Sequence, residues 1–138
     1  MNQRREVRCP SGAILKIQLA PFKASKDLYQ VLLVELHNIS LSSQMEMANV
    51  YKELICRGFS SPAIELSLQE CFKSCTYDNG SGEQKITPDT FEAVSAREDY
   101  MLVCTEVTIE NVAPFMKNLS AVSSRIMSLA GTMAKSPA

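Results

Sequence analysis

The sequence predicts a mainly α fold, a small helical bundle with an N-terminal β-hairpin. Apolar residues alternate with polar ones on both sides of residues 10–12, as they do in paired strands. Later stretches carry apolar residues at helical spacing between cap residues, and the longest of them spans residues 86–119. From the length of 138 residues, we expect a single helical domain over 1–119 that includes the hairpin at about 5–20. Residues 120–138 are expected to form a C-terminal helical arm or a partly disordered tail.

The two predicted strands span residues 6–9 and 13–19. Pro10 suits the first central position of a type I turn, and Gly12 can take the left-handed conformation that closes a three-residue loop with a bulge. An isolated two-stranded hairpin is only marginally stable in water. This hairpin must therefore pack on its own helical core or add its free edge to the sheet of another chain, and we expect the first arrangement.

The first half of the chain predicts three helices that pack as a small bundle. Ser25 can cap a helix over residues 26–38, which has a broad apolar face. Residues 40–57 carry a second helical pattern, which ends at Gly58, a natural C-cap. Pro62 suits the first position of a third helix. The apolar stripe of this third helix consists of Ile64, Leu68, Cys71, Phe72 and Cys75.

A surface loop is predicted over residues 77–82, where Asp78, Asn79, Gly80 and Gly82 break the helical pattern. The same residue types occur in calcium-binding loops. The ordered carboxylates and the distal glutamate that such a loop requires are missing, however. We therefore expect a simple turn that divides the two halves of the domain.

The stretch over residues 86–119 predicts a buried central helix. Thr87 is a good N-cap and Pro88 suits the first helical position, so a short helix should run to about Val94. Ser95 can then cap a long helix that is apolar almost all round. Its expected buried residues are Met101, Leu102, Val103, Cys104, Val107, Ile109 and Val112. The carboxylates expected to form a solvated stripe along it are Glu98, Asp99, Glu106 and Glu110.

The C-terminal segment carries a heptad pattern that predicts a partner-binding helix. Apolar residues recur at intervals of three and four at Val112, Phe115, Leu119, Val122, Ile126, Leu129 and Met133. Pro114 removes a backbone donor, so the long helix should kink or break there. This apolar row either folds back onto the core or binds a helix of a partner, and both arrangements remain open. The candidate partner-binding residues are Phe115, Leu119, Val122, Ile126, Leu129 and Met133.

Composition argues against nucleic-acid and membrane partners. The formal net charge is −1, and the one basic cluster, Arg4, Arg5 and Arg8, is expected to be a solvated N-terminal arm. No apolar run approaches the roughly 18 to 20 residues that span a bilayer, and no signal-peptide pattern follows the N-terminus. We therefore expect a protein of the cytoplasm.

No catalytic, metal or cofactor site is predicted. His37 is the only histidine, and no Ser/His/Asp spacing accompanies it. The five cysteines lack the spacing of a disulfide scaffold, so we expect reduced thiols. Cys71 and Cys75 share a helical face and could form half of a metal site. The further ligands would have to come from Cys56, Cys104 and His37 in three other segments, so we expect no metal, no cofactor and no enzyme activity.

Five short segments resemble the tail assembly chaperones of long-tailed, non-contractile bacteriophages. In order along the chain, they are residues 9–13 (CPSGA), 19–22 (LAPF), 60–62 (SSP), 86–91 (ITPDTF) and 111–115 (NVAPF). The resemblance covers residues 7–119 and includes the order of the elements as well as these words. Members of the family coat the tape measure protein during tail assembly and recruit tail tube subunits. The resemblance therefore implies binding without an active site.

The partners implied by this resemblance are the tape measure protein and the tail tube protein, in the cytoplasm of a bacterial host, and homo-oligomerisation is a further expectation. The C-terminal apolar row would cover helices of the tape measure protein and give way as tube subunits polymerise. Weak contacts repeated along one long client permit such a handover. The sequence leaves one alternative open, a structural virion or tail-completion protein that is retained in the particle through its hairpin edge.

Overall fold

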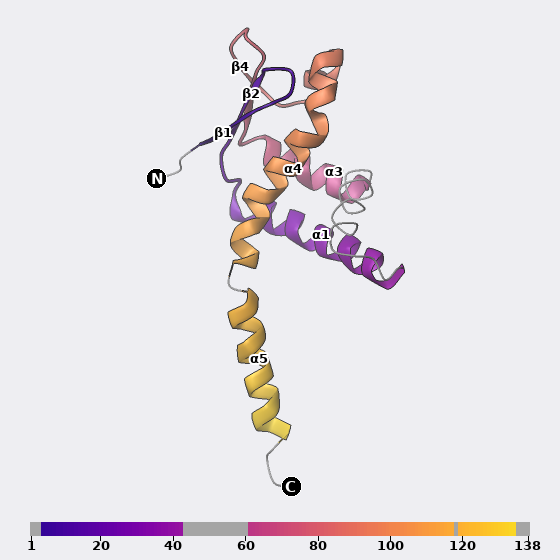
Figure 1. Ribbon diagram of the computed structural model, residues 1–138, viewed down its shortest axis with the longest axis vertical. Helices are drawn as coiled ribbons and strands as arrows, with labels where there is room; N and C mark the ends of the chain where they lie inside the picture. Colours follow the sequence, from indigo (N-terminus) through magenta and orange to yellow (C-terminus); the bar gives the residue numbers. More distant parts are fainter. Residues whose placement is uncertain (1–3, 43–60, 118, 135–138) are drawn as a thin grey trace.

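The computed structural model describes residues 4–42, 61–117 and 119–134, and in it helices pack with a four-stranded antiparallel sheet (Figure 1). The strands lie across the sheet in the order β1 (Arg5–Arg8), β2 (Ile14–Ile17), β3 (Thr76–Asp78) and β4 (Glu83–Lys85). The helices are α1 (Phe22–Ser42), α3 (Pro62–Phe72), the 3-10 helix η1 (Pro88–Phe91), α4 (Val94–Met116) and α5 (Leu119–Ala134). Helices with an N-terminal hairpin are confirmed, but the sheet is larger than predicted.

The predicted N-terminal hairpin lies on the core of its own chain. Gly12 has a φ of +95°, and its N–H donates a hydrogen bond to the carbonyl of Cys9 at 2.9 Å. The N–H of Cys9 donates in turn to the carbonyl of Ala13 at 2.8 Å, which closes the loop. On β2, Leu15 and Ile17 are fully buried. The inner face of this strand therefore belongs to the core.

A second hairpin, which was expected to be only a surface loop, pairs with the first. β3 lies beside β2 with Tyr77 opposite Leu15, and β4 returns beside β3. In the turn between them, Gly80 and Gly82 have positive φ values, and the Asp78 carboxylate accepts hydrogen bonds from both of their N–H groups, at 2.8 and 3.2 Å. The loop prediction was wrong for Tyr77, which is buried in a strand. Strands of three residues alternate too briefly to be detected in a sequence.

The first helix begins earlier than predicted. α1 starts at Phe22, so Ser25 lies inside its first turn and is not the N-cap. The Ser25 side chain is buried, and its hydroxyl donates a hydrogen bond to Oδ1 of Asn111 at 2.8 Å. Because the Ser25 hydroxyl already has a hydrogen-bond partner on α4, it is not needed to cap α1.

The next two predicted helices differ in outcome. The helix over residues 40–57 falls largely outside the described residues, so the three-helix bundle stays a prediction. The third helix is confirmed, because α3 begins at Pro62 and buries Ile64, Leu68, Cys71 and Phe72. Cys75 is buried too, but it lies beyond the end of α3.

The helix starts around Pro88 are close to those predicted. η1 begins at Pro88 but ends at Phe91, before the expected end near Val94. A hydrogen bond of 3.0 Å from the N–H of Thr87 to Oγ1 of Thr90 stabilises its start. α4 follows from Val94 with Ala93 at the N-cap, so Ser95 lies within the helix and does not cap it.

We use the name body for the part of the fold formed by β1–β4, α1, α3, η1 and α4. α4 is its longest described helix, and part of the buried face of α4 is polar. Val103 and Val107 are fully buried, and so are Asp99 and Asn111. Met101 and Ile109, which were expected in the core, are 40% and 51% exposed. The predicted burial is therefore confirmed for Val103, Cys104, Val107 and Val112 and wrong for Met101 and Ile109. Burial of the two polar side chains is favourable because hydrogen-bond partners face them.

Asp99 joins three parts of the fold. Its carboxylate accepts hydrogen bonds from the N–H of Ser11 at 3.1 Å, from the Ser11 hydroxyl at 2.5 Å and from the Tyr77 hydroxyl at 2.7 Å. These contacts connect the first hairpin, β3 and α4. Asp99 was expected to lie on a solvated stripe, and the structure corrects this expectation.

Arg4 and Arg5 form ion pairs with residues of β4 and α4. Arg5 forms ion pairs with Glu106 at 2.6 Å and with Glu110 at 2.8 Å, and these contacts tie β1 to α4. Arg4 pairs with Glu83 of β4 at 3.1 Å. The expected solvated arm is therefore wrong for Arg4 and Arg5, and Glu106 and Glu110 are not simply solvated.

Replacing Asn111 with alanine should lower the free energy of unfolding by about 2 kcal/mol. The Asn111 side chain is fully buried, accepts hydrogen bonds from the N–H of Ala20 at 2.9 Å and from Ser25, and donates one to the carbonyl of Val107 at 2.8 Å. Alanine removes all of these contacts. Urea unfolding followed by circular dichroism measures the change. The half-exposed Ile109→Ala serves as the control, and an equal loss in both variants would contradict the argument.

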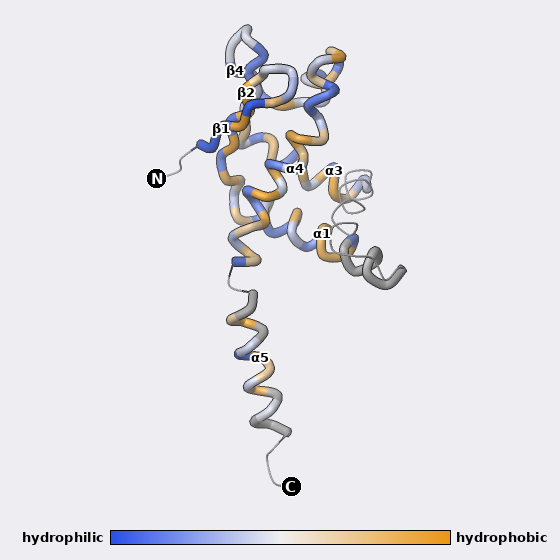
Figure 2. Tube along the Cα trace, in the orientation of Figure 1, coloured by the Kyte–Doolittle hydropathy of each residue, from blue (hydrophilic) through white to orange (hydrophobic). Residues whose placement is uncertain are grey.

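α4 continues through Pro114 to Met116, and the N–H of Lys117 donates to the carbonyl of Ala113 at 3.0 Å. The expected break at the proline is thus displaced toward the C-terminus. Pro114 still deprives the carbonyl of Glu110 of its usual helix partner. From Leu119, α5 extends away from the body on the side opposite the sheet (Figure 1), and apolar residues recur along it (Figure 2).

Candidate functional site

The predicted partner-binding residues fall into two groups, and the first lies on the body. Phe115 is in the last turn of α4 and is half-buried. Its ring stacks on that of Tyr29 in α1, with 5.2 Å between ring centroids and 16° between planes. Phe22, at the start of α1, lies 6.0 Å from Phe115 between ring centroids. Phe115 therefore joins α4 to α1.

The second group forms an exposed row on α5. We use the name α5 row for Val122, Ile126 and Leu129, whose exposed fractions are 51%, 62% and 58%. Leu119 and Met133 belong to the same helix, but their side chains are outside the described part of the structure. Among the described elements, none forms an extensive contact with α5. The α5 row is therefore separate from the aromatic contacts of Phe115.

The body adds exposed apolar side chains near the α4 and α5 junction. Phe22, which touches Phe115, is 70% exposed, and Met116 at the end of α4 is 48% exposed. Leu19, just before α1, is 45% exposed. From the sequence, residues 19–22 were expected only to lead into the first helix. Their position near Phe115 could not be predicted, because no local pattern connects two segments so far apart in the chain.

The chemistry of α5 suits binding to apolar surface. Its sequence contains one charged residue, Arg125, which is exposed, and no histidine, cysteine, aspartate or glutamate. Its sequence also contains four serines, of which Ser124 and Ser128 are exposed. An exposed apolar row with a polar surround is typical of an interaction site. The sequence of α5 supplies no side chain that could act as a general base for its hydroxyl groups.

The described cysteines are buried, free thiols. Burial raises the pKa of Cys9 and Cys75 to about 11 and the pKa of Cys71 and Cys104 to about 12. A catalytic thiolate requires a shift in the opposite direction. Where the structure describes side chains, no group of three or more His, Cys, Asp or Glu residues could hold a metal ion. Cys56 and the side chain of His37 are outside that part.

Thiol alkylation should be slow in the folded protein and should become fast on unfolding. Folding raises the pKa of Cys71 from its ordinary value of 9.0 to about 12, so this thiol favours the folded state fully below pH 9. Its contribution to stability is lost as pH rises from 9 toward 12. Iodoacetamide labelling of a Cys56→Ser variant at pH 8, with and without urea, followed by mass spectrometry, measures reactivity. Fast labelling of Cys71 without urea would contradict its burial.

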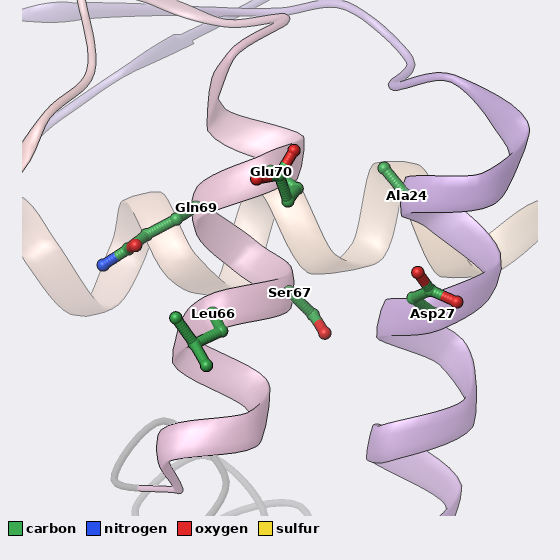
Figure 3. A pocket seen from close by; sticks show the side chains of 6 residues that line it. All are labelled: Ala24, Asp27, Leu66, Ser67, Gln69 and Glu70. Carbon is green, nitrogen blue, oxygen red and sulfur yellow. The ribbon is translucent and has the colours of Figure 1, made fainter.

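Two hollows lie beside α3. The smaller, of about 230 Å³, lies between α1 and α3, and Figure 3 shows Asp27 on one side and Ser67 and Glu70 on the other. Its lining has no cationic or aromatic side chain, and carboxylates stand on both helices. The larger, of about 630 Å³, is lined from α3, the segment 85–91 and Tyr100. No sequence motif could reveal this groove, because its lining comes from separate parts of the chain.

Comparisons with known protein families, curated proteins and solved structures gave no match for this chain. Within the described ranges, no helix combines the length and the apolar character needed to cross a membrane. The function of this chain is therefore inferred from its own geometry. Its clearest feature is a folded body that leaves the α5 row uncovered.

Proposed function

We propose that this protein is a non-enzymatic tail assembly chaperone of a long-tailed bacteriophage, acting in the cytoplasm of the bacterial host. It binds the tape measure protein and helps to recruit tail tube subunits. The observation that carries the proposal is the α5 row, whose three side chains are each more than half exposed at heptad spacing. The body buries its own core without them, so they are free to cover an apolar client.

The length of α5 suits a weak and repeated contact. A helix of 16 residues is about 24 Å long and presents only two heptads to a partner. One such contact binds weakly, but many copies on one long client bind together. Charges that fix the register of paired helices are almost missing, because Arg125 is the one charged residue of α5. Because no fixed register is imposed, α5 can bind at many positions along the client and can be released when tube subunits polymerise.

The sheet edges favour a chaperone over a structural protein retained by strand addition. The outer strands are β1, with four residues, and β4, with three. They carry charged side chains at Arg5, Glu6, Arg8, Glu83 and Lys85. Short, charged edge strands discourage pairing with another sheet. We further propose that the helices of the body form a small bundle on the sheet, since α1, α3 and α4 contact one another.

Co-expression with the neighbouring long helical open reading frame, the expected tape measure protein, tests the proposal. We expect affinity capture of the client to recover several copies per client, counted by size-exclusion chromatography with light scattering. The client should stay in the soluble fraction only when the two are expressed together. Finished phage particles should lack the protein. Failure to associate, or a fixed copy number in purified particles, would contradict the chaperone function and favour a structural one.

A further inference from the structure

The turn between β3 and β4 contains the one Asn-Gly pair of the sequence, Asn79 followed by Gly80. The other asparagines precede glutamine, isoleucine, valine or leucine, whose side chains hinder approach to the next backbone nitrogen. Glycine has no Cβ, so its nitrogen can be approached closely. Asn79 and Gly80 are exposed, and they lie at the end of the molecule opposite α5 (Figure 1). This is the residue pair from which an asparagine side chain can lose ammonia.

The deamidation of Asn79 needs only water besides the chain itself. The Gly80 nitrogen gives up its proton, and its electron pair attacks Cγ of Asn79 in an intramolecular step. The bond from Cγ to the side-chain nitrogen breaks, and that nitrogen takes up a proton and leaves as ammonia. Water then opens the cyclic imide at one of its two carbonyl carbons. The product is aspartate or isoaspartate, and isoaspartate adds a carbon to the main chain.

In the folded chain, the attacking nitrogen is held by Asp78. The Gly80 N–H donates a hydrogen bond of 2.8 Å to Oδ1 of Asp78, and the Gly82 N–H donates to the same oxygen at 3.2 Å. Hydrogen bonds to a carboxylate are stronger than those between neutral groups. Removal of the Gly80 proton would place an anion beside this carboxylate, and the repulsion of like charges opposes that step. Asp78 therefore counteracts attack by the Gly80 nitrogen.

The rest of the turn does not protect Asn79. Its Oδ1 accepts a hydrogen bond from the Ser81 N–H at 3.2 Å, and a donor at this oxygen stabilises the charge that develops during attack. Among the described residues, none has an atom within 4 Å of the position that a Cβ on Gly80 would take. The turn is thus open to water. Protection comes from the hydrogen bond to Asp78 and not from burial.

We propose that Asn79 is a site of spontaneous deamidation and that Asp78 restrains the reaction while the hairpin of β3 and β4 is closed. Opening of this hairpin frees the Gly80 nitrogen and starts the reaction. Both products add a carboxylate next to Asp78, and isoaspartate also lengthens the turn. Glu83, which follows the turn, pairs with Lys16 of β2 at 3.1 Å. Modification of Asn79 therefore weakens the attachment of β4 to the sheet.

Incubation of the full chain at pH 8 in ¹⁸O-labelled water, followed by peptide mapping with mass spectrometry, tests the proposal. Deamidation in this medium puts one labelled oxygen into residue 79, and chromatography separates the aspartate form from the isoaspartate form. We expect the rate at Asn79 to rise about tenfold or more when urea unfolds the chain. Gly80→Ala should slow the reaction severalfold in urea, because the added Cβ hinders attack by the nitrogen of residue 80.

Asp78→Ala removes the restraint without urea. Its rate of deamidation in buffer should be about tenfold higher than that of the parent, because a hydrogen bond to a charged group is lost. Glu83→Ala is the matched control. It removes another carboxylate of the same hairpin, with its ion pair to Lys16, but leaves the bond between Gly80 and Asp78 in place. Its rate should stay within about twofold of the parent rate.

Hydrogen exchange of the ¹⁵N-labelled parent, followed by NMR, tests the restraint without any variant. The Gly80 N–H is exposed, yet it should exchange about tenfold or more slowly than in the urea-unfolded chain, because Asp78 holds it. Equal exchange in the two states would remove the role of Asp78. This measurement decides the question even where Asp78→Ala fails to fold, which its NMR spectrum would show.

Other results would also overturn the proposal. Absence of label at residue 79 in urea would remove Asn79 as a modification site, and equal rates with and without urea would show that the fold does not restrain it. Equal acceleration in Asp78→Ala and Glu83→Ala would assign the restraint to the stability of the hairpin in general. No client protein enters these measurements, so the proposal does not depend on the chaperone function.

Discussion

Replacing Asp99 with alanine should lower the free energy of unfolding by about 3 to 5 kcal/mol. The carboxylate is fully buried and accepts hydrogen bonds from the Ser11 N–H, the Ser11 hydroxyl and the Tyr77 hydroxyl. Tyr77 is itself 2% exposed, so its hydroxyl has little access to water as a substitute partner. Alanine therefore removes several hydrogen bonds at once and leaves a buried donor unpaired, which is the costlier part of the change.

Urea unfolding at constant pH, followed by circular dichroism, measures this loss from the shift of the midpoint. Glu98→Ala is the matched control, because it removes a neighbouring carboxylate that is exposed on the same helix. Tyr77→Phe removes only one donor and should cost about 1 to 2 kcal/mol. If Asp99→Ala and Glu98→Ala unfold at the same urea concentration, the carboxylate does not hold the hairpins to α4.

The sequence predicted the first hairpin better than the second for a local reason. Gly12 follows Pro10 between two alternating stretches, and each of these signals lies within a few residues of the others. Tyr77, by contrast, is a strand residue because β2 offers it Leu15 as a neighbour. That neighbour is 62 residues away in the chain, and a strand of three residues has no periodicity of its own.

Buried polar residues were missed for a related reason. Aspartate and asparagine at exposed helix positions are common, so spacing alone placed Asp99 on a solvated stripe. Burial of Asp99 depends on Ser11 and Tyr77, and burial of Asn111 depends on Ala20 and Ser25. These partners come from other elements. A helical pattern can show on which side of a helix a residue lies, but it cannot show which residues of other elements pack against that side.

The spacing of the α5 row was visible in the sequence, whereas its exposure was not. Apolar residues at heptad intervals serve equally well for packing on a core and for packing on a partner. The choice depends on whether the body offers an uncovered apolar face to α5. Phe115 meets Tyr29 and Phe22, but Val122 and Ile126 stay more than half exposed. Only the three-dimensional arrangement distinguishes these two parts of one continuous pattern.

Ile126→Asp combined with Leu129→Asp should weaken binding to the tape measure protein about 100-fold while changing the free energy of unfolding by less than about 0.5 kcal/mol. The two side chains are 62% and 58% exposed in the free protein, so charge at these positions costs the folded state little. On a client helix they would be buried. Affinity capture from the co-expressed pair measures binding, and urea unfolding measures stability.

Met127→Asp provides the control that separates a specific face from general hydrophobicity. Met127 is 73% exposed and lies on α5 next to Ile126, turned from it by about 100° around the helix axis. It carries the same change from apolar to charged, but it does not belong to the α5 row. Equal loss of binding in the control would contradict the heptad face, because the effect would then follow from charge anywhere on α5. Global unfolding of the double variant would show instead that the α5 row stabilises the body.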